Sequence, residues 1–158
     1  MSGVVVAVDP GTVRTGVAAT DPGQVLASPV TTLDAAASVS GVVRELVERE
    51  AVAVVVGLPL HLSGAEGTAA DSARSYAERL AAAAAAPVFL VDERLTTVSA
   101  TAALRSSGRD GRSARRVVDQ AAATALLQAV VDAAATRGVD CLSLLDDGFG
   151  ERVQGEPR

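Results

Sequence analysis

Acidic residues follow two strongly apolar segments of this chain. Asp9 comes directly after the apolar run at 4–8, and the pair Asp92-Glu93 follows the run at 88–91. In open α/β sheets, functional sites form beyond the carboxyl ends of the strands, so parallel strands here would bring these acids to one edge. Clustered carboxylates at such an edge could act as metal ligands. A lone aspartate after a strand more often caps a turn, and the second acidic strand end favours the site.

A third acid, Asp119, lies at the border of the apolar stripe of a helix expected over 114–136. Arg115 and Arg116 precede it by four and three residues, so Asp119 could simply form a surface ion pair. A carboxylate at the inner margin of a helix face made of small residues could equally approach metal ligands on a sheet edge. The spacing leaves both interpretations open.

Basic residues are unevenly distributed. All 14 are arginine in a chain of net charge -5, which argues against coating of the whole surface by nucleic acid. Five of them nevertheless crowd into twelve positions with only Asp110 opposing them: Arg105, Arg109, Arg112, Arg115 and Arg116. Arginine without lysine suits bidentate phosphate contacts, and a solvated charged loop explains the cluster equally well.

These candidate residues must be positioned by one α/β domain, expected over residues 1–145, with a flexible tail at 146–158. The apolar runs predict strands at 4–8, 16–19, 25–30, 52–56 and 88–91. Helices are expected from Asp34 to about Glu50, over 68–86, over 97–107 and over 114–136, with a polar loop at 108–113. The later strands are apolar on both faces, which is typical of parallel strands covered by helices. The pattern therefore predicts a mixed five-stranded sheet, antiparallel first and parallel afterwards, flanked by helices.

Composition excludes several other classes of protein. The single cysteine, Cys141, rules out an internal disulfide framework and is expected to be a small buried residue. Aromatic residues make up only 2% of the 158 residues, so base stacking cannot be a main binding mode. No apolar run has the length of a membrane span and no signal peptide is evident, so a soluble cytoplasmic protein is expected.

Four segments, in order, resemble the signature segments of the YqgF/RuvX family. They are Asp9-Pro10-Gly11-Thr12 with Arg14 and Gly16, Val56-Gly57-Leu58-Pro59-Leu60 leading to Gly64, Asp92-Glu93-Arg94-Leu95-Thr96-Thr97, and Val118-Asp119-Gln120-Ala121-Ala122. The resemblance implies an RNase H-like fold related to the RuvC Holliday junction resolvases. It also implies a bacterial cytoplasmic nuclease, a monomer or homodimer, that matures the 5′ end of the pre-16S ribosomal RNA. The alternative activity is resolution of branched DNA.

The same resemblance implies which residues do the chemistry. The acids of the site fall on Asp9, Glu93 and Asp119, which would bind Mg²⁺ or Mn²⁺ and hydrolyse a phosphodiester with two ions. Nucleic acid would be contacted by arginines, those near the acids positioning the reacting backbone and the others following the strand further out: Arg14, Arg94, Arg115 and Arg116, then Arg105, Arg109 and Arg112. Val13 and His61 depart from the family pattern, and His61 is expected to contact phosphate or to have no role.

Two competing classes remain open at this stage. The hairpin at 9–16 also resembles the phosphate-binding hairpin of actin-like, Hsp70-like and sugar-kinase nucleotide-binding proteins, which need two such domains around a nucleotide. A chain with this fold could also be a catalytically silent RNA-binding factor, although the presence of all three acids argues against that.

Overall fold

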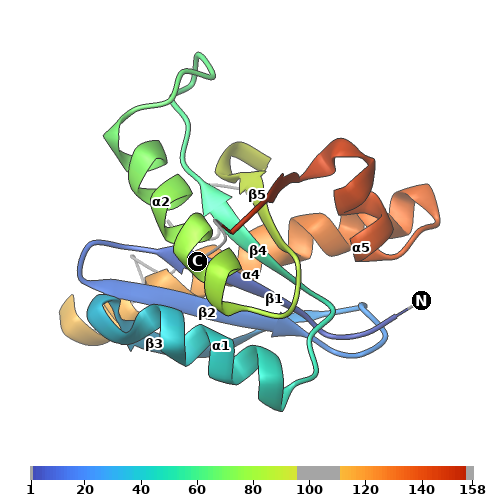
Figure 1. The fold of residues 1–158 in the computed structure, drawn as a ribbon, viewed down its shortest axis with the longest axis horizontal. Coiled ribbons are helices and arrows are strands. Elements are labelled where there is room, and N and C mark those ends of the chain that lie inside the picture. The colour runs from blue at the N-terminus through green and yellow to red at the C-terminus, as the bar shows by residue number, and fades with distance from the viewer. Residues whose placement is uncertain (1, 96–110, 156–158) are drawn as a thin grey trace.

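A computed structural model describes residues 2–95 and 111–155 of the chain, which form a mixed six-stranded sheet with helices on both faces (Figure 1). The strands are β1 (Val5–Pro10), β2 (Arg14–Thr20), β3 (Ala27–Asp34), β4 (Ala53–Leu58), β5 (Val88–Asp92) and β6 (Glu151–Val153). The α-helices are α1 (Ser38–Glu48), α2 (Thr68–Ala83), α4 (Gly111–Arg137) and α5 (Cys141–Leu144), and the short turns are η1 (Ala35–Ala37), η2 (Glu93–Leu95) and η3 (Leu145–Phe149). Among these described residues, no helix is both long and apolar enough to cross a bilayer.

The strand directions follow the expected pattern. In the spatial order β3-β2-β1-β4-β5-β6, β1 and β2 are antiparallel and so are β2 and β3. Strand β1 then runs parallel to β4, and β4 parallel to β5. The carboxyl ends of these three central strands therefore meet at one edge of the sheet, as the sequence predicted.

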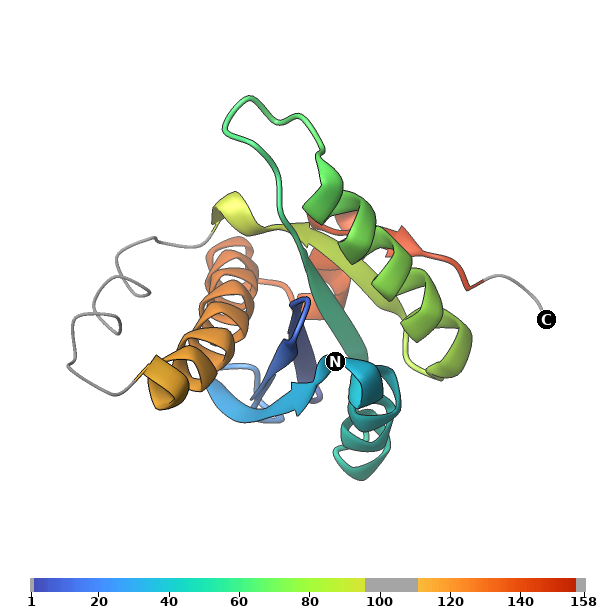
Figure 2. The same cartoon turned by 90° about the vertical axis from the view of Figure 1, so that its left-hand side faces the viewer.

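Each face of the sheet carries its own core. Val5 and Ala7 of β1 point to the face covered by α4 and α5, and Val6 and Val8 point to the face covered by α1 and α2. Figure 2 shows the two helical layers on opposite sides of the sheet. Because alternate strand residues face opposite layers, burial on both sides requires strands that are apolar throughout.

The C-terminal segment corrects two expectations. The sheet has six strands and not five, because β6 pairs antiparallel with β5 through Val88↔Val153. The segment expected as a flexible tail from 146 thus carries secondary structure, in η3 and β6, up to Val153. Leu144 and Leu145 are fully buried just before this segment, and the free edge of β5 gives β6 its backbone hydrogen-bond partners. Few apolar residues among glycines and aspartates left little sequence signal for it.

Helix boundaries also differ from the expected ones. Helix α4 begins at Gly111, so the polar loop predicted at 108–113 is wrong for 111–113, and the helix expected at 97–107 lies outside the described residues. Helix α1 begins at Ser38 after the turn η1, and the side chain of Asp34 makes no capping hydrogen bond. A strand β3 that extends to Asp34 delays the start of this helix.

Candidate active site

Asp9 lies between two glycines of the neighbouring strands. In β2, Gly16 is the residue paired with Asp9, and Gly57 follows the last paired residue of the adjacent strand β4. A Cβ atom at Gly57 would lie 2.6 Å from Oε1 of Glu93, and one at Gly16 would overlap the carbonyl oxygen of Asp119. Each missing side chain therefore leaves room for one of the other two acids. A glycine inside an apolar strand is the sequence signal for such a close approach, and this role was not anticipated.

Asp9, Glu93 and Asp119 interact electrostatically. Burial, a side-chain hydrogen bond with Glu93, and the charges of Glu93 and Asp119 together raise the pKa of Asp9 to about 8. A hydrogen bond between two carboxyl groups requires that one of them holds a proton. The structure thus brings together the three acids that the sequence singled out.

Helix α4 brings Asp119 close to the sheet because the buried residue of its next turn is small. Ala123, one turn after Asp119, is fully buried against the sheet. The side chain of Gln120 donates a hydrogen bond of 2.9 Å to Thr32 on β3, which fixes the helix across β2. This close packing lets the backbone of α4 contact Gly16.

Arg14 pairs with one acid of the cluster. Its Nε atom donates to Oδ2 of Asp119 at 3.2 Å, and both side chains are partly buried, with exposed fractions of 19% and 28%. Arg14 was expected to contact nucleic acid, and in this structure it neutralises an acid of the site.

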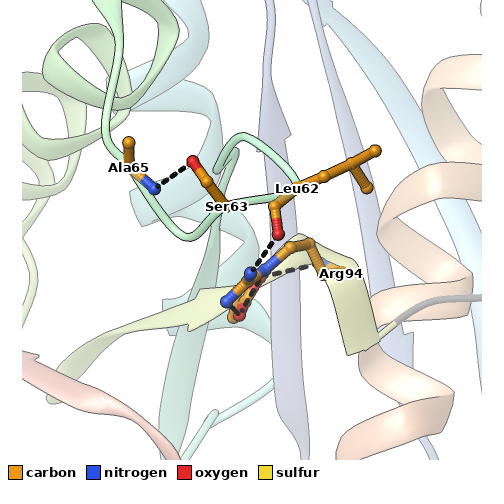
Figure 3. Close-up of polar contacts among 5 residues, drawn as sticks. Leu62, Ser63, Ala65 and Arg94 are labelled. Atoms are coloured by element: carbon orange, nitrogen blue, oxygen red, sulfur yellow. Dashed lines mark hydrogen bonds and ion pairs between the residues drawn. The ribbon is translucent and has the colours of Figure 1, made fainter.

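Arg94 fastens the loop between β4 and α2 to the edge of the sheet. Its guanidinium donates to Asp92 at 2.7 Å and to the carbonyl oxygen of Leu62 at 3.4 Å, and the amide of Ala65 donates to Ser63 Oγ in the same loop (Figure 3). The side chain of Leu62 points away from Arg94 into solvent. In this structure Arg94 therefore connects the loop to the sheet, whereas the sequence suggested a contact with phosphate.

The remaining predicted arginines lie before Asp119 in the chain or outside the described residues. The backbones of Arg112, Arg115 and Arg116 belong to the first turns of α4. Arg105 and Arg109 fall in the range that the structure does not describe, so their role in binding nucleic acid stays a prediction.

Two further reactive residues lie apart from the acids. Cys141 is fully buried, as expected, and burial followed by the charge of Asp140 raises the pKa of its thiol to about 11. The amide of His61 donates to the carbonyl of Ala65, and its ring lies over Gly67. Neither residue contributes to the cluster of acids.

The donor set of this site fits a hard divalent cation. Carboxylate oxygens are the ligands preferred by Mg²⁺ and Mn²⁺, and a cation relieves repulsion between neighbouring acids. As they stand, no three Asp, Glu, His or Cys side chains of the described residues enclose a point where an ion could sit. For an ion to bind there, the shared hydrogen bond of Asp9 and Glu93 and the Arg14–Asp119 pair would have to rearrange.

The raised pKa of Asp9 predicts a pH-dependent stability in the absence of metal. The folded protein holds this proton up to about pH 8, whereas the unfolded chain loses it near 3.8. Because the folded state binds more protons between these values, the contribution of Asp9 to stability is full below pH 4 and falls as the pH rises to 8.

Asp9→Asn should therefore be more stable than the wild type by roughly 1 to 3 kcal/mol at pH 8.5, and by much less at pH 5. Urea denaturation of both proteins in EDTA at the two pH values measures this difference. Asp147→Asn, at an exposed position, is the control. An equal difference in stability between the two proteins at both pH values would contradict the raised pKa of Asp9.

Sequence comparisons identify close relatives. The sequence model of the RuvX family, described as Holliday junction resolvase, matches residues 3–133. A protein of Kineococcus radiotolerans named "Putative pre-16S rRNA nuclease" is 50% identical over 139 residues, which cover 85% of this chain and 74% of that protein. A protein of the same name from Thermobifida fusca is 49% identical over 140 residues, covering 83% of this chain and 88% of the relative.

The fold resembles that of RuvC, a protein of solved structure. T. thermophilus RuvC, in complex with a Holliday junction substrate, superposes with a TM-score of 0.58 over 96% of this chain and 99% of that chain. The sequence identity is 13%, so this similarity concerns the fold. It confirms the RNase H-like architecture that the sequence motifs implied.

Proposed function

Because this chain belongs to the RuvX family, we propose that it is a divalent-metal-dependent nuclease that hydrolyses phosphodiester bonds in the 5′-end maturation of pre-16S ribosomal RNA. The observation that supports this most strongly is the interaction of Asp9 with both Glu93 and Asp119 at the carboxyl ends of the parallel strands. Relatives that are 50% and 49% identical to this chain over the aligned residues carry the name "Putative pre-16S rRNA nuclease", which supports this substrate.

Each acid has a distinct task in this proposal. The three acids would hold Mg²⁺ or Mn²⁺, which would supply activation of water and stabilisation of the leaving oxygen. Asp9 holds the centre of the site from the rigid strand β1, and Glu93 supplies its oxygens over Gly57. Asp119 approaches from α4, on the opposite side of Asp9. The arginines at 112, 115 and 116 precede Asp119 on α4 and would neutralise the phosphates of the nucleic acid.

A Holliday junction is the second candidate substrate. The description of the matching family model names that activity, and the RuvC fold supports it. The acids alone do not distinguish RNA from branched DNA, because both present the same phosphodiester.

One experiment separates the two substrates. The purified protein is incubated with a 16S rRNA fragment that keeps its 5′ extension, with a four-way DNA junction, and with a DNA duplex of matched sequence. We expect Mg²⁺-dependent loss of the RNA extension, mapped by primer extension, and no cleavage in EDTA. Cleavage of the junction alone would favour the resolvase, and cleavage of none of the three would contradict the proposed nuclease. Glu93→Gln, purified identically, excludes contaminating nucleases.

Gly57→Ala tests whether the space beside Asp9 matters. The new methyl group would meet Oε1 of Glu93 at 2.6 Å, and this flexible end of the side chain can move away. We expect a loss of cleavage of about 10²-fold, the scale of a 1 Å misplacement, with a stability change of about 1 kcal/mol or less.

Gly41→Ala is the matched control, because its methyl group would meet the end of the Leu33 side chain at 2.7 Å on the other face of the sheet. Single-turnover cleavage and thermal melts are measured for both variants. Full activity of Gly57→Ala would show that Glu93 does not need this position.

A further inference from the structure

The ion pair between Arg14 and Asp119 joins two segments that are 105 residues apart in sequence. Arg14 lies on the same face of β2 as Gly16, two residues earlier, and so borders the site where α4 approaches the sheet. With exposed fractions of 19% and 28%, the pair is accessible to an incoming ion or phosphate.

Without a cation, two different contacts reduce the repulsion among the acids. Asp9 and Glu93 share a hydrogen bond, which removes one negative charge through a proton. Asp119 instead accepts a hydrogen bond from the guanidinium of Arg14. A divalent ion that binds Asp119 through Oδ2 would have to displace the guanidinium of Arg14 from this oxygen.

We propose that Arg14 is a positioning residue that competes with the divalent ion for Asp119 and transfers to a substrate phosphate when the ion binds. The inference rests on the proposed nuclease function. Arginine suits the exchange because its planar donors bind carboxylate and phosphate in the same geometry. A phosphate that takes Arg14 away from Asp119 frees that carboxylate for the ion, so nucleic acid and metal strengthen each other's binding.

The proposal predicts effects of opposite sign. Arg14→Gln should bind Mn²⁺ more tightly than the wild type, by about fivefold, which is the lower end of common coupling factors. The same variant should bind nucleic acid less tightly in the presence of a divalent ion. A residue that only contacted phosphate would leave Mn²⁺ binding unchanged.

Mn²⁺ affinity is measured by the electron paramagnetic resonance signal of the free ion, without nucleic acid, for the wild type, Arg14→Gln and Arg44→Gln. Arg44 is exposed on α1, on the other face of the sheet, and its loss changes the net charge equally. We expect tighter binding only for Arg14→Gln. In the Asp119→Asn background, Arg14→Gln should give no further gain, because the competition acts through Asp119.

RNA binding is measured by anisotropy of a short fluorescein-labelled RNA, in EDTA and in Ca²⁺. The wild type and Arg14→Gln should bind this RNA alike in EDTA, where Arg14 is engaged by Asp119, and only the wild type should gain fully from Ca²⁺. Gel analysis of the RNA after each titration confirms that it stays intact. Equal weakening of Arg14→Gln in both conditions would identify a simple phosphate contact and overturn the proposal.

Other outcomes also decide the matter. Unchanged or weaker Mn²⁺ binding by folded Arg14→Gln, or an equal gain for Arg44→Gln, overturns the competition. If the wild type and Asp119→Asn bind Mn²⁺ identically, Asp119 is not a metal ligand. That result would contradict the proposed metal site and the proposed nuclease function. Should Arg14→Gln fail to melt cooperatively, Arg14→Lys, which keeps the charge but not the planar donors, serves in its place and should show a smaller gain of the same sign.

Discussion

Asp9→Asn is expected to slow divalent-dependent cleavage by about 10³-fold or more. Asp9 is the acid that interacts with both other carboxylates, and it lies on the central strand of the site. The amide keeps the shape of the side chain but removes the charge that would hold a metal ion, and metal ions supply several kcal/mol of transition-state stabilisation. Each 1.36 kcal/mol lost from that stabilisation slows the reaction about tenfold.

Single-turnover cleavage of the 5′-extended RNA, at saturating Mg²⁺, measures the loss. The variant should stay folded, because the same substitution is expected to increase the stability of the protein at pH 8.5. Asp147→Asn provides a control for loss of one acidic charge at an exposed position. A folded Asp9→Asn protein that cleaves within tenfold of the wild type would remove Asp9 from the reaction.

The position of the acids was predictable because it follows from strand geometry. The runs at 52–56 and 88–91 are apolar on both faces, which is required for parallel strands between two helical layers. Parallel strands end at one edge, so Asp9 and Glu93 had to meet there. The sequence pattern alone did not assign Asp119 to the site, because its spacing from Arg115 and Arg116 was equally compatible with a surface ion pair.

The contacts within the site were not predictable from the same patterns. Arg94 follows Asp92 by two residues, and only the turn η2 decides that its guanidinium folds back onto that acid. Arg14 and Asp119 are far apart in sequence, and their pairing depends on how closely α4 approaches β2. Strand β6 escaped detection because its three residues owe their conformation to the free edge of β5 and not to a hydrophobic pattern of their own.

Gly16→Ala is expected to destabilise the protein by about 3 kcal/mol or more, the upper range for overpacking of a core. Its methyl group would overlap the carbonyl oxygen of Asp119 and approach the amide nitrogen of Gln120 to 3.0 Å. Both are backbone atoms of α4, so no side-chain rotation can relieve the contact and the helix itself must move. For a chain of this size, the melting temperature should fall by roughly 6 to 12 °C.

Gly57→Ala is the internal comparison, because it adds the same methyl group on the other side of Asp9, against the flexible end of Glu93. Thermal melts in EDTA should show a large loss for Gly16→Ala and a small one for Gly57→Ala, while Mn²⁺ binding should weaken in both. A wild-type melting temperature for Gly16→Ala would mean that α4 lies farther from β2 than this structure has it. Asp119 would then lie farther from Asp9, and the conclusion that close packing of α4 on β2 brings the third acid to the site would be wrong.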